Sequence, residues 1–308
     1  MPRFLLLLNR GSGGNDRGLD AGDVCRTVEV AFREAGHDIT SRIVEPGQLE
    51  TSLKQAVAAA PDGVIIAGGD GTVSAAARLL GGTPIALGIV PMGTFNLAAR
   101  DLGVPLEIEE AARFLAQAKV MAVDVLDAAG HACLCTTILG FYPEFARTFE
   151  RRDHGGHWWK KAFKLVTSLP RIFREARPLR LTWKSEGGEG GARTKFSAFV
   201  PGRYKATTGI VPVRTDFRSG TMTAYIGRQR HAGAAMRGMM DYIFGRQEEN
   251  GELTIFKAAR LELGAGRRRH AMVMVDGEIL RLEFPLVLSV RPLHLNVLTT
   301  EENLASAP

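Results

Sequence analysis

Residues 64–73 read Val-Ile-Ile-Ala-Gly-Gly-Asp-Gly-Thr-Val. The apolar run at the start is typical of a buried strand, and the spacing of apolar residues from Val73 onward indicates a helix. Glycines at 68, 69 and 71 bring backbone N–H groups close to a ligand, and the start of a helix attracts an anion. The stretch therefore predicts a phosphate-binding turn, with Asp70 at its edge where a carboxylate engages magnesium or a polarised hydroxyl.

Alternating strand and helix patterns fill the first 120 residues. We expect strands near residues 3–8, 38–44, 63–67 and 84–90, and helices near 20–35, 47–60 and 73–80. Thr72 stands where the N-cap of the last helix is expected. This alternation is typical of a parallel sheet with helices on both faces, whose ligands gather at the carboxyl ends of the strands. The sequence therefore predicts an α/β, Rossmann-like nucleotide domain.

The pattern changes after about residue 122 to short alternating runs that end in glycine-rich turns. We expect strands at Phe196–Val200, Met222–Ile226, Met272–Val275 and Ile279–Phe284. The glycine run at 187–191 is interpreted as a turn or loop, and Cys133 and Cys135 as alternate positions on one strand. These features predict a second, mostly antiparallel β-sandwich domain.

Composition excludes several classes of protein. The chain has 308 residues, 45% of them apolar, which is enough for two domains. Its net charge of +6 favours anionic partners, but no signature of nucleic-acid binding is present. The apolar run within Met1 to Leu8 is too short for a signal peptide or a membrane span and is interpreted as a buried strand. The three cysteines form no disulfide framework, so a reduced, cytoplasmic chain is expected.

A separate helical pattern runs from about residue 144 to residue 176 and is amphipathic. Its aromatic and basic residues include Trp158, Trp159, Lys160, Lys161 and Lys164. One interpretation is a helix that lies on an anionic membrane, with the tryptophans at the interface. The other, which we favour, is a helix packed on the β domain with a solvated basic face, since amphipathic helices are usually core elements.

Two further strands end in glycine-bearing turns of similar chemistry. In residues 91–103, Thr94 is placed to cap a new helix and Asn96 offers an amide to a ribose or a phosphate. Residues 9–15 follow the first strand and include Ser12. No turn is a P-loop or a complete dinucleotide fingerprint, and neither HExxH nor GxSxG occurs. Each turn alone is compatible with a plain capped connection, but together they predict a nucleotide cleft.

These motifs together resemble the diacylglycerol kinase catalytic-domain family, the bacterial lipid kinases related to diacylglycerol and sphingosine kinases. The resemblance rests on the Gly68–Thr72 turn, on the segment from Pro91 to Pro105, and on Asp276-Gly277-Glu278. It extends over nearly the whole chain, to the closing Pro285-Leu286 strand pattern that looks like the return to the first domain.

The resemblance implies an architecture and a reaction. A nucleotide domain similar to those of NAD kinases and phosphofructokinases would comprise residues 1–121, with about 292–308 returning to it, and a lipid-binding β-sandwich would comprise 122–291. The implied reaction is ATP- and Mg²⁺-dependent transfer of the γ-phosphoryl group to the hydroxyl of a diacylglycerol-like or other long-chain lipid. The enzyme would be cytoplasmic, peripheral at the inner membrane face, and compatible with a homodimer.

The resemblance also assigns site residues. ATP would be contacted by Asn9, Ser12, Gly68, Gly69, Asp70, Gly71, Thr72, Gly93, Thr94 and Asn96. Asp70 would also bind the catalytic Mg²⁺ that ATP brings. The general base would be one of Asp276 and Glu278; Glu278 is slightly favoured, with Asp276 orienting it or the metal. Judged on the residues alone, the same stretch is an excellent β-hairpin with an Asp-Gly turn.

Three places depart from the family pattern. Leu97 stands where many members have Asp, and Val44 stands where Thr is often seen. The turn Arg218-Ser219-Gly220-Thr221 stands where many members carry acidic residues that help to hold a structural magnesium. Because Leu97 and Ser219 supply no carboxylate, the resemblance implies that this structural metal site does not form.

Two other functions stay open. Kinases that phosphorylate NAD share a similar GGDGT-type turn, so a soluble acceptor such as NAD is one alternative. The missing acidic positions make a catalytically inactive nucleotide-binding protein the other. The acceptor itself is not identified, because lipid pockets are lined by interchangeable apolar residues.

Overall fold

The computed structural model describes residues 1–11, 20–45, 47–93, 96–140, 177–205, 213–228, 251 and 253–305. Ser12, Thr94 and the helix expected over residues 144–176, with Trp158, Trp159, Lys160, Lys161 and Lys164, lie outside these ranges.

Four parallel strands form the sheet of the N-terminal half, in the order β2-β1-β3-β4. They are β1 (Arg3–Asn9), β2 (Asp38–Val44), β3 (Gly63–Gly68) and β4 (Ala86–Pro91). Every residue of β3 and β4 is buried, as expected for apolar strands that are covered on both faces. The strands expected from the apolar runs are confirmed.

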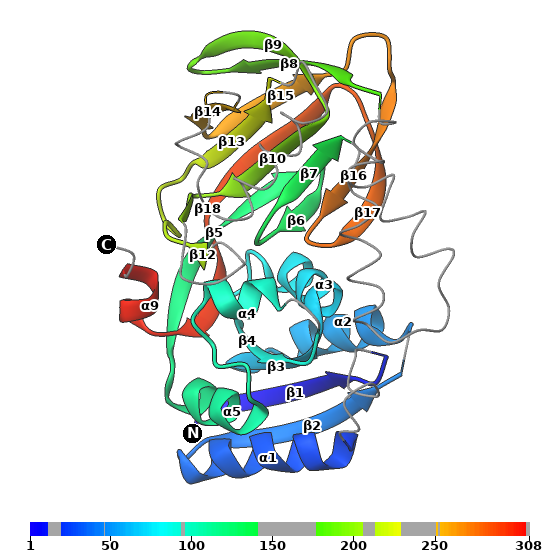
Figure 1. Cartoon of the computed structure of the whole chain (residues 1–308). Helices are drawn as coiled ribbons and strands as arrows, with labels where there is room; N and C mark the ends of the chain where they lie inside the picture. Colours follow the sequence, from blue (N-terminus) through cyan, green and yellow to red (C-terminus); the bar gives the residue numbers. More distant parts are fainter. Residues whose placement is uncertain are drawn as a thin grey trace.

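Helices cover both faces of this sheet (Figure 1). On one face lie α1 (Ala21–Glu34) and α5 (Ile108–Gln117), and on the other lie α2 (Leu49–Ala59), α3 (Asp70–Leu80) and the short α4 (Leu97–Asp101). The second face is the one that meets the β half, so α3 lies between the two halves of the molecule (Figure 1).

The C-terminal half is built from mostly antiparallel strands, most of them short. They are β5 (Lys119–Ala128), β6 (His131–Cys133), β7 (Thr137–Gly140), β8 (Leu179–Ser185), β9 (Gly188–Thr194), β10 (Phe196–Pro201), β11 (Tyr204–Lys205), β12 (Val213–Arg214), β13 (Met222–Gly227), β14 (Leu253–Ala258), β15 (Arg260–Gly264), β16 (His270–Val275), β17 (Glu278–Glu283) and β18 (Leu286–Thr299). The helix α9 (Glu301–Ala305) follows them. Strands β14-β13-β10-β7-β16-β17 form one sheet, and β18-β15-β8-β9 continue the sheet that begins at β2.

A second hydrophobic core lies between these two antiparallel layers. It joins Leu181 and Trp183 of β8 and Leu263 of β15 to Phe199 of β10 and Val273 of β16. In β8 buried and exposed residues alternate, as expected for a strand with one face on a core. The predicted fold class is therefore confirmed: an α/β domain is followed by a mostly antiparallel β-sandwich.

Two long strands connect the halves. β18 pairs with β15 near its start and meets β4 in parallel at Val297, and β5 runs antiparallel beside it. The predicted domain boundaries at 121 and 292 fall inside β5 and β18. Because both strands belong to the two halves at once, the division at these residues stays a prediction.

A buried polar cluster also joins the halves, and the sequence analysis did not predict it. The Asp101 carboxylate at the end of α4 accepts hydrogen bonds from the Tyr204 hydroxyl at 2.9 Å and from the Arg214 backbone N–H at 3.0 Å. Burial raises the pKa of Asp101 to about 7, against the opposing effect of these hydrogen bonds.

Three local predictions are wrong. The helix expected from residue 73 begins at Asp70, with Gly69 rather than Thr72 as the N-cap. Of the glycine run at 187–191, only its start is a turn, and Gly188 to Gly191 belong to β9. Gly190 is required there, because a Cβ at this position would lie 2.4 Å from the Trp183 ring. Cys135 lies beyond the end of β6, so Cys133 and Cys135 do not share a strand.

None of the helices in the described part of the chain combines the length and the apolar character needed to cross a bilayer.

Candidate active site

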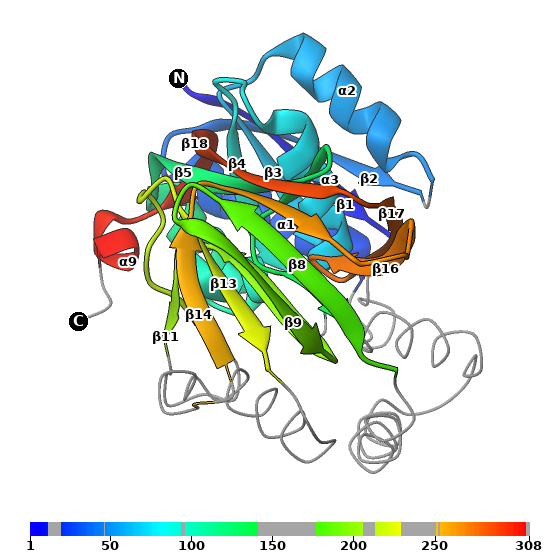
Figure 2. The ribbon, with the colours of Figure 1, turned by 90° about the horizontal axis from the view of Figure 1, so that it is seen from above.

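A cavity of about 740 Å³ lies between α3 and the β16–β17 hairpin. In both views of the ribbon the hairpin lies next to α3 (Figures 1 and 2). Its described polar lining comprises Glu50, Asp70, Ser74, Arg78, His131, Asp276 and Glu278. The structure thus places Asp70 and Gly71 of the first half and the Asp276-Gly277-Glu278 turn of the second half around one cavity.

The glycines of the two predicted phosphate turns pack against each other. A Cβ on Gly93 would lie 2.8 Å from the Cα of Gly69, and a Cβ on Gly69 would lie 3.3 Å from the Cα of Gly93. Gly71 differs, because a Cβ there would meet no described atom within 4 Å, and Gly71 lines the cavity. The fold therefore explains why 69 and 93 are glycine, whereas the space beside Gly71 is available to a ligand.

Asp70 connects the two turns. Its carboxylate oxygens accept hydrogen bonds from the backbone N–H of Leu97 at 2.7 Å and of Asn96 at 3.0 Å. Burial raises the pKa of Asp70, and these two hydrogen bonds oppose that rise. The Leu97 backbone therefore binds Asp70 even though its side chain lacks the carboxylate seen in many family members.

The other predicted nucleotide contacts hold the turns in shape. The Asn9 amide donates to the Thr72 hydroxyl at 2.9 Å, which ties the end of β1 to the first turn of α3. The Asn96 amide donates to the Gly93 carbonyl at 2.9 Å and accepts from the Gly93 N–H at 2.8 Å. Asn96 adopts a left-handed conformation with φ of 51° directly before α4. Since these amides already have partners, their direct contact with nucleotide stays a prediction.

Asp276 anchors the hairpin. Its buried carboxylate accepts hydrogen bonds from the backbone N–H groups of Leu134, Cys135 and Thr136 at 2.6 to 2.9 Å, and from the Cys133 thiol at 3.2 Å. Burial raises the pKa of Asp276, and these N–H donors oppose the rise. Because four donors engage its carboxylate, Asp276 holds the turn in position.

Of the two candidate bases, Asp276 and Glu278, only Glu278 has a carboxylate without a described hydrogen bond. It is exposed, begins β17 and pairs with Val275 across a two-residue turn in which Asp276 and Gly277 have φ of 46° and 91°. Within the part of the chain that the structure describes, no hydrogen bond or ion pair engages the Glu278 carboxylate. The predicted Asp-Gly hairpin is confirmed, and it presents Glu278 to the cavity.

Four polar residues of the cavity wall were not predicted from the sequence: Glu50, Ser74, Arg78 and His131. A signal was present, since Asp70, Ser74 and Arg78 follow one another at four-residue spacing and therefore lie along one side of α3. Glu50 lies in the first turn of α2, and only the packing of α2 beside α3 brings it to the cavity.

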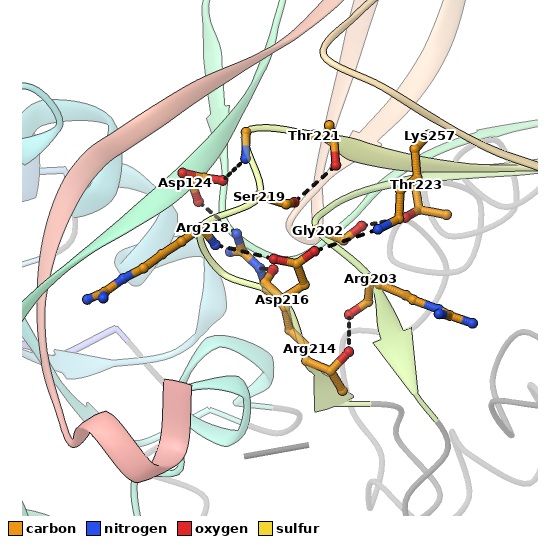
Figure 3. Close-up of polar contacts among 12 residues, drawn as sticks. Asp124, Gly202, Arg203, Arg214, Asp216, Arg218, Ser219, Thr221, Thr223 and Lys257 are labelled. Carbon is orange, nitrogen blue, oxygen red and sulfur yellow. Dashed lines mark hydrogen bonds and ion pairs between the residues drawn. The ribbon is translucent and has the colours of Figure 1, made fainter. Parts of the chain in front are cut away.

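A structural magnesium at the turn of residues 218–221 would need carboxylate oxygens around it. Asp124 is fully buried on β5 and lies close to this turn (Figure 3). Its carboxylate accepts hydrogen bonds from the backbone N–H of Gly220 at 2.7 Å and of Leu293 at 2.9 Å. The Asp216 carboxylate lies 3.8 Å from the Lys257 ammonium (Figure 3).

The same turn carries a cation of its own. The Arg218 guanidinium donates to the Ala122 carbonyl at 2.9 Å, and the Ser219 and Thr221 hydroxyls bond each other at 3.0 Å. Among the described residues no three acidic, histidine or cysteine side chains gather at this turn, so it has too few ligands for a divalent cation. The residues present therefore do not fit a structural magnesium.

We predict that removal of divalent cations does not destabilise the nucleotide-free protein. A site bound at a hundred times its Kd would add about 2.7 kcal/mol, which shifts Tm by a few degrees. Thermal unfolding in EDTA and in excess Mg²⁺ should therefore give the same Tm. A Tm that falls in EDTA and returns with Mg²⁺ would contradict this prediction.

The residues around Asp70 do fit the Mg²⁺ that accompanies a nucleotide. Each Asp70 oxygen uses one lone pair for a backbone N–H, which leaves acceptor capacity on both oxygens for a hard cation. Gly71 provides the open space beside them. Bound there, Mg²⁺ would neutralise phosphate charge.

The profile of the diacylglycerol kinase catalytic domain matches residues 3–128. The resemblance to the diacylglycerol kinase catalytic-domain family is confirmed. This match covers β1 to β5, and therefore includes Gly68–Thr72, Gly93 and Asn96 but not the Asp276–Glu278 turn.

Curated proteins named as lipid kinases match less than half of the chain. A protein named "Probable lipid kinase YegS-like" from Stenotrophomonas maltophilia is 35% identical over 147 residues, which is 44% of this chain and 45% of the relative. A protein of the same name from Pectobacterium atrosepticum is 35% identical over 129 residues, 40% of this chain and 41% of the relative. The aligned part thus spans less than half the length of these relatives.

The fold extends the likeness to the whole chain. The crystal structure of a diacylglycerol kinase from Bacillus anthracis superposes with a TM-score of 0.71 at 20% identity, covering 97% of both chains. At this identity the likeness concerns the fold. It supports the two-domain architecture for the C-terminal half as well as for the matched half.

Proposed function

We propose that this protein is an ATP-dependent lipid kinase that transfers the γ-phosphoryl group to a hydroxyl of a diacylglycerol-like or other long-chain lipid. The observation that carries the proposal is the shared cavity. Asp70 and Gly71 of a phosphate-binding turn line it from one half, and the free carboxylate of Glu278 lines it from the other. Phosphoryl transfer needs this pairing of a phosphate-holding element with a base for the acceptor.

Glu278 takes the role of the general base. It accepts the proton of the acceptor hydroxyl while the hydroxyl oxygen bonds to the γ-phosphorus and the bond from that phosphorus to the β–γ bridging oxygen breaks, releasing ADP. Asp276 acts as a positioning residue, since its bonds to the 134–136 backbone hold the turn that carries Glu278. Asp70 holds the two glycine turns together and would hold the Mg²⁺ that accompanies ATP.

We propose that the lipid acceptor lies against the apolar side chains of the cavity wall. The wall around Glu278 includes Met274, Val275 and Leu280, and the opposite wall includes Leu49 and Leu97. Apolar side chains next to a base suit the hydroxyl of a lipid better than a soluble dinucleotide, whose many polar groups require polar partners. We therefore place the enzyme at the surface of a membrane, where such an acceptor is found.

The test is incubation of the protein with labelled ATP, Mg²⁺ and vesicles that contain diacylglycerol or other lipid alcohols, beside a parallel incubation with NAD. We expect label in the lipid fraction and none in NAD. Label in NAD alone would favour the soluble-acceptor alternative. No transfer to either, with ATP binding intact, would favour the inactive nucleotide-binding alternative and would overturn the proposal.

Gly71→Ala separates ligand binding from folding. The added methyl group meets no described atom of the protein and replaces a helical glycine, so the free energy of unfolding should stay the same or rise by up to about 1 kcal/mol. The same methyl group enters the cavity, so we expect ATP affinity to fall by on the order of tenfold or more. Tm and calorimetric titration with ATP measure the two effects. A variant that binds ATP as tightly as the wild type would contradict the placement of the phosphates.

A further inference from the structure

Arg78 carries the permanent positive charge of the cavity wall, as far as the wall is described. Its guanidinium lies 3.3 Å from Glu50, and 39% of its side chain is exposed. The remaining charged wall is acidic, with Asp70, Asp276 and Glu278. A phosphate-bearing ligand in so acidic a cavity requires compensating positive charge.

The position of Arg78 on α3 suits such a contact. Arg78 stands eight positions after Asp70, which corresponds to about 12 Å along the helix axis. Side chains on a helix generally lean toward its N-terminus, and this is the direction in which Asp70 lies from Arg78. Ser74, midway between the two, lines the same cavity.

The ion pair that holds Arg78 is one that a ligand can replace. Glu50 also bonds Lys54, whose ammonium lies 2.9 Å from its other oxygen. The pKa of Glu50 is lowered, and the hydrogen bond and charge of Lys54 contribute more to this than the charge of Arg78 does. Because Lys54 remains as a partner, release of Arg78 does not leave Glu50 uncompensated, and exposed ion pairs of this kind contribute little stability.

We propose that Arg78 binds a phosphate group of the ligand that occupies this cavity, and that it exchanges Glu50 for this group on binding. The inference rests on the proposed function, since it assigns the far end of the same cavity. The phosphate belongs either to the nucleotide or to the headgroup of an anionic lipid acceptor. Arg suits either source, because its planar guanidinium donates two parallel hydrogen bonds to phosphate oxygens.

The experiment compares Arg78→Gln with Lys54→Gln by calorimetric titration. Both changes remove a cation that pairs with Glu50, but only Arg78 lines the cavity. The probes are ATP with Mg²⁺, monomeric dihexanoyl phosphatidylglycerol, and dihexanoylglycerol as the neutral lipid. Tm of each variant shows whether the protein is folded.

We expect Arg78→Gln to weaken binding of ATP or of dihexanoyl phosphatidylglycerol by on the order of tenfold or more, with dihexanoylglycerol unaffected. Loss for ATP assigns the contact to the nucleotide, and loss for the phospholipid assigns it to the headgroup. Arg78→Lys should recover part of the affinity, because the charge returns without the planar fork.

Three results would overturn the proposal. The first is an Arg78→Gln protein that matches Lys54→Gln for every probe. The second is an Arg78→Gln protein that loses as much affinity for the neutral lipid as for the charged probes. The third is a wild type that binds neither charged probe. None of these readouts requires turnover. Failure of the proposed function has a different signature, which is intact ATP binding without any phosphorylated lipid.

Discussion

Glu278→Gln should lower kcat for lipid phosphorylation by about 10²- to 10⁴-fold, the usual contribution of a positioned general base. Glutamine has nearly the same size and shape but does not accept the proton of the acceptor hydroxyl. The side chain is exposed and has no described hydrogen bond, so the free energy of unfolding should change by less than about 0.5 kcal/mol. Initial rates with saturating ATP, together with Tm, measure both effects.

Glu283→Gln is the matched control. Glu283 is an exposed glutamate at the opposite end of β17, where it lies 3.6 Å from His270 and does not line the described cavity. Its substitution should leave kcat unchanged. If Glu278→Gln retained the rate of this control, Glu278 would not be the base.

Asp276→Ala should lower the free energy of unfolding by about 4 kcal/mol or more. The change removes the acceptor of three backbone N–H groups, and each buried donor left without a partner costs about 1–3 kcal/mol. It also places alanine at φ of 46°, where a residue other than glycine, asparagine or aspartate costs about 1–2 kcal/mol. Urea unfolding of the nucleotide-free protein measures the loss.

Asp276→Asn serves as the comparison. Asparagine tolerates the left-handed conformation and keeps one acceptor oxygen, so it should cost less than alanine. Both variants should also lose activity, because the turn that they loosen carries Glu278. If Asp276→Ala had the same free energy of unfolding as the wild type, Asp276 would not anchor the turn. It would then again be a candidate for the general base.

The sheet and the position of the phosphate turns were predictable from the sequence because their signals are local. Val64 to Ala67 are continuous apolar residues that end in glycines, and strand, turn and helix follow within a few positions. The Asp276–Gly277 hairpin was predictable for the same reason. Thr72 was misplaced as N-cap because Asp70 begins the helix while its carboxylate binds Leu97 and Asn96, a contact that lies outside any local window.

The sequence did not predict that Asp276 anchors the turn and that Glu278 is left to act as the base. This difference depends on the backbone of Leu134 to Thr136, about 140 positions earlier in the chain, whose N–H groups turn toward Asp276. Likewise, Arg214 and Asp101 are single polar residues without a motif, and only the folded chain brings them together. Long-range packing of this kind leaves no periodic signal.

The most direct test of a phosphoryl-transfer site between Asp70 and Glu278 is a comparison of lipid extracts. Cells that overproduce the wild type, Glu278→Gln or Asp70→Ala would be analysed by mass spectrometry for phosphorylated lipids. We predict a phosphorylated lipid that accumulates only with the wild type, at equal levels of folded protein. Accumulation of the same species with Glu278→Gln, or no new phosphorylated lipid with the wild type, would contradict the account.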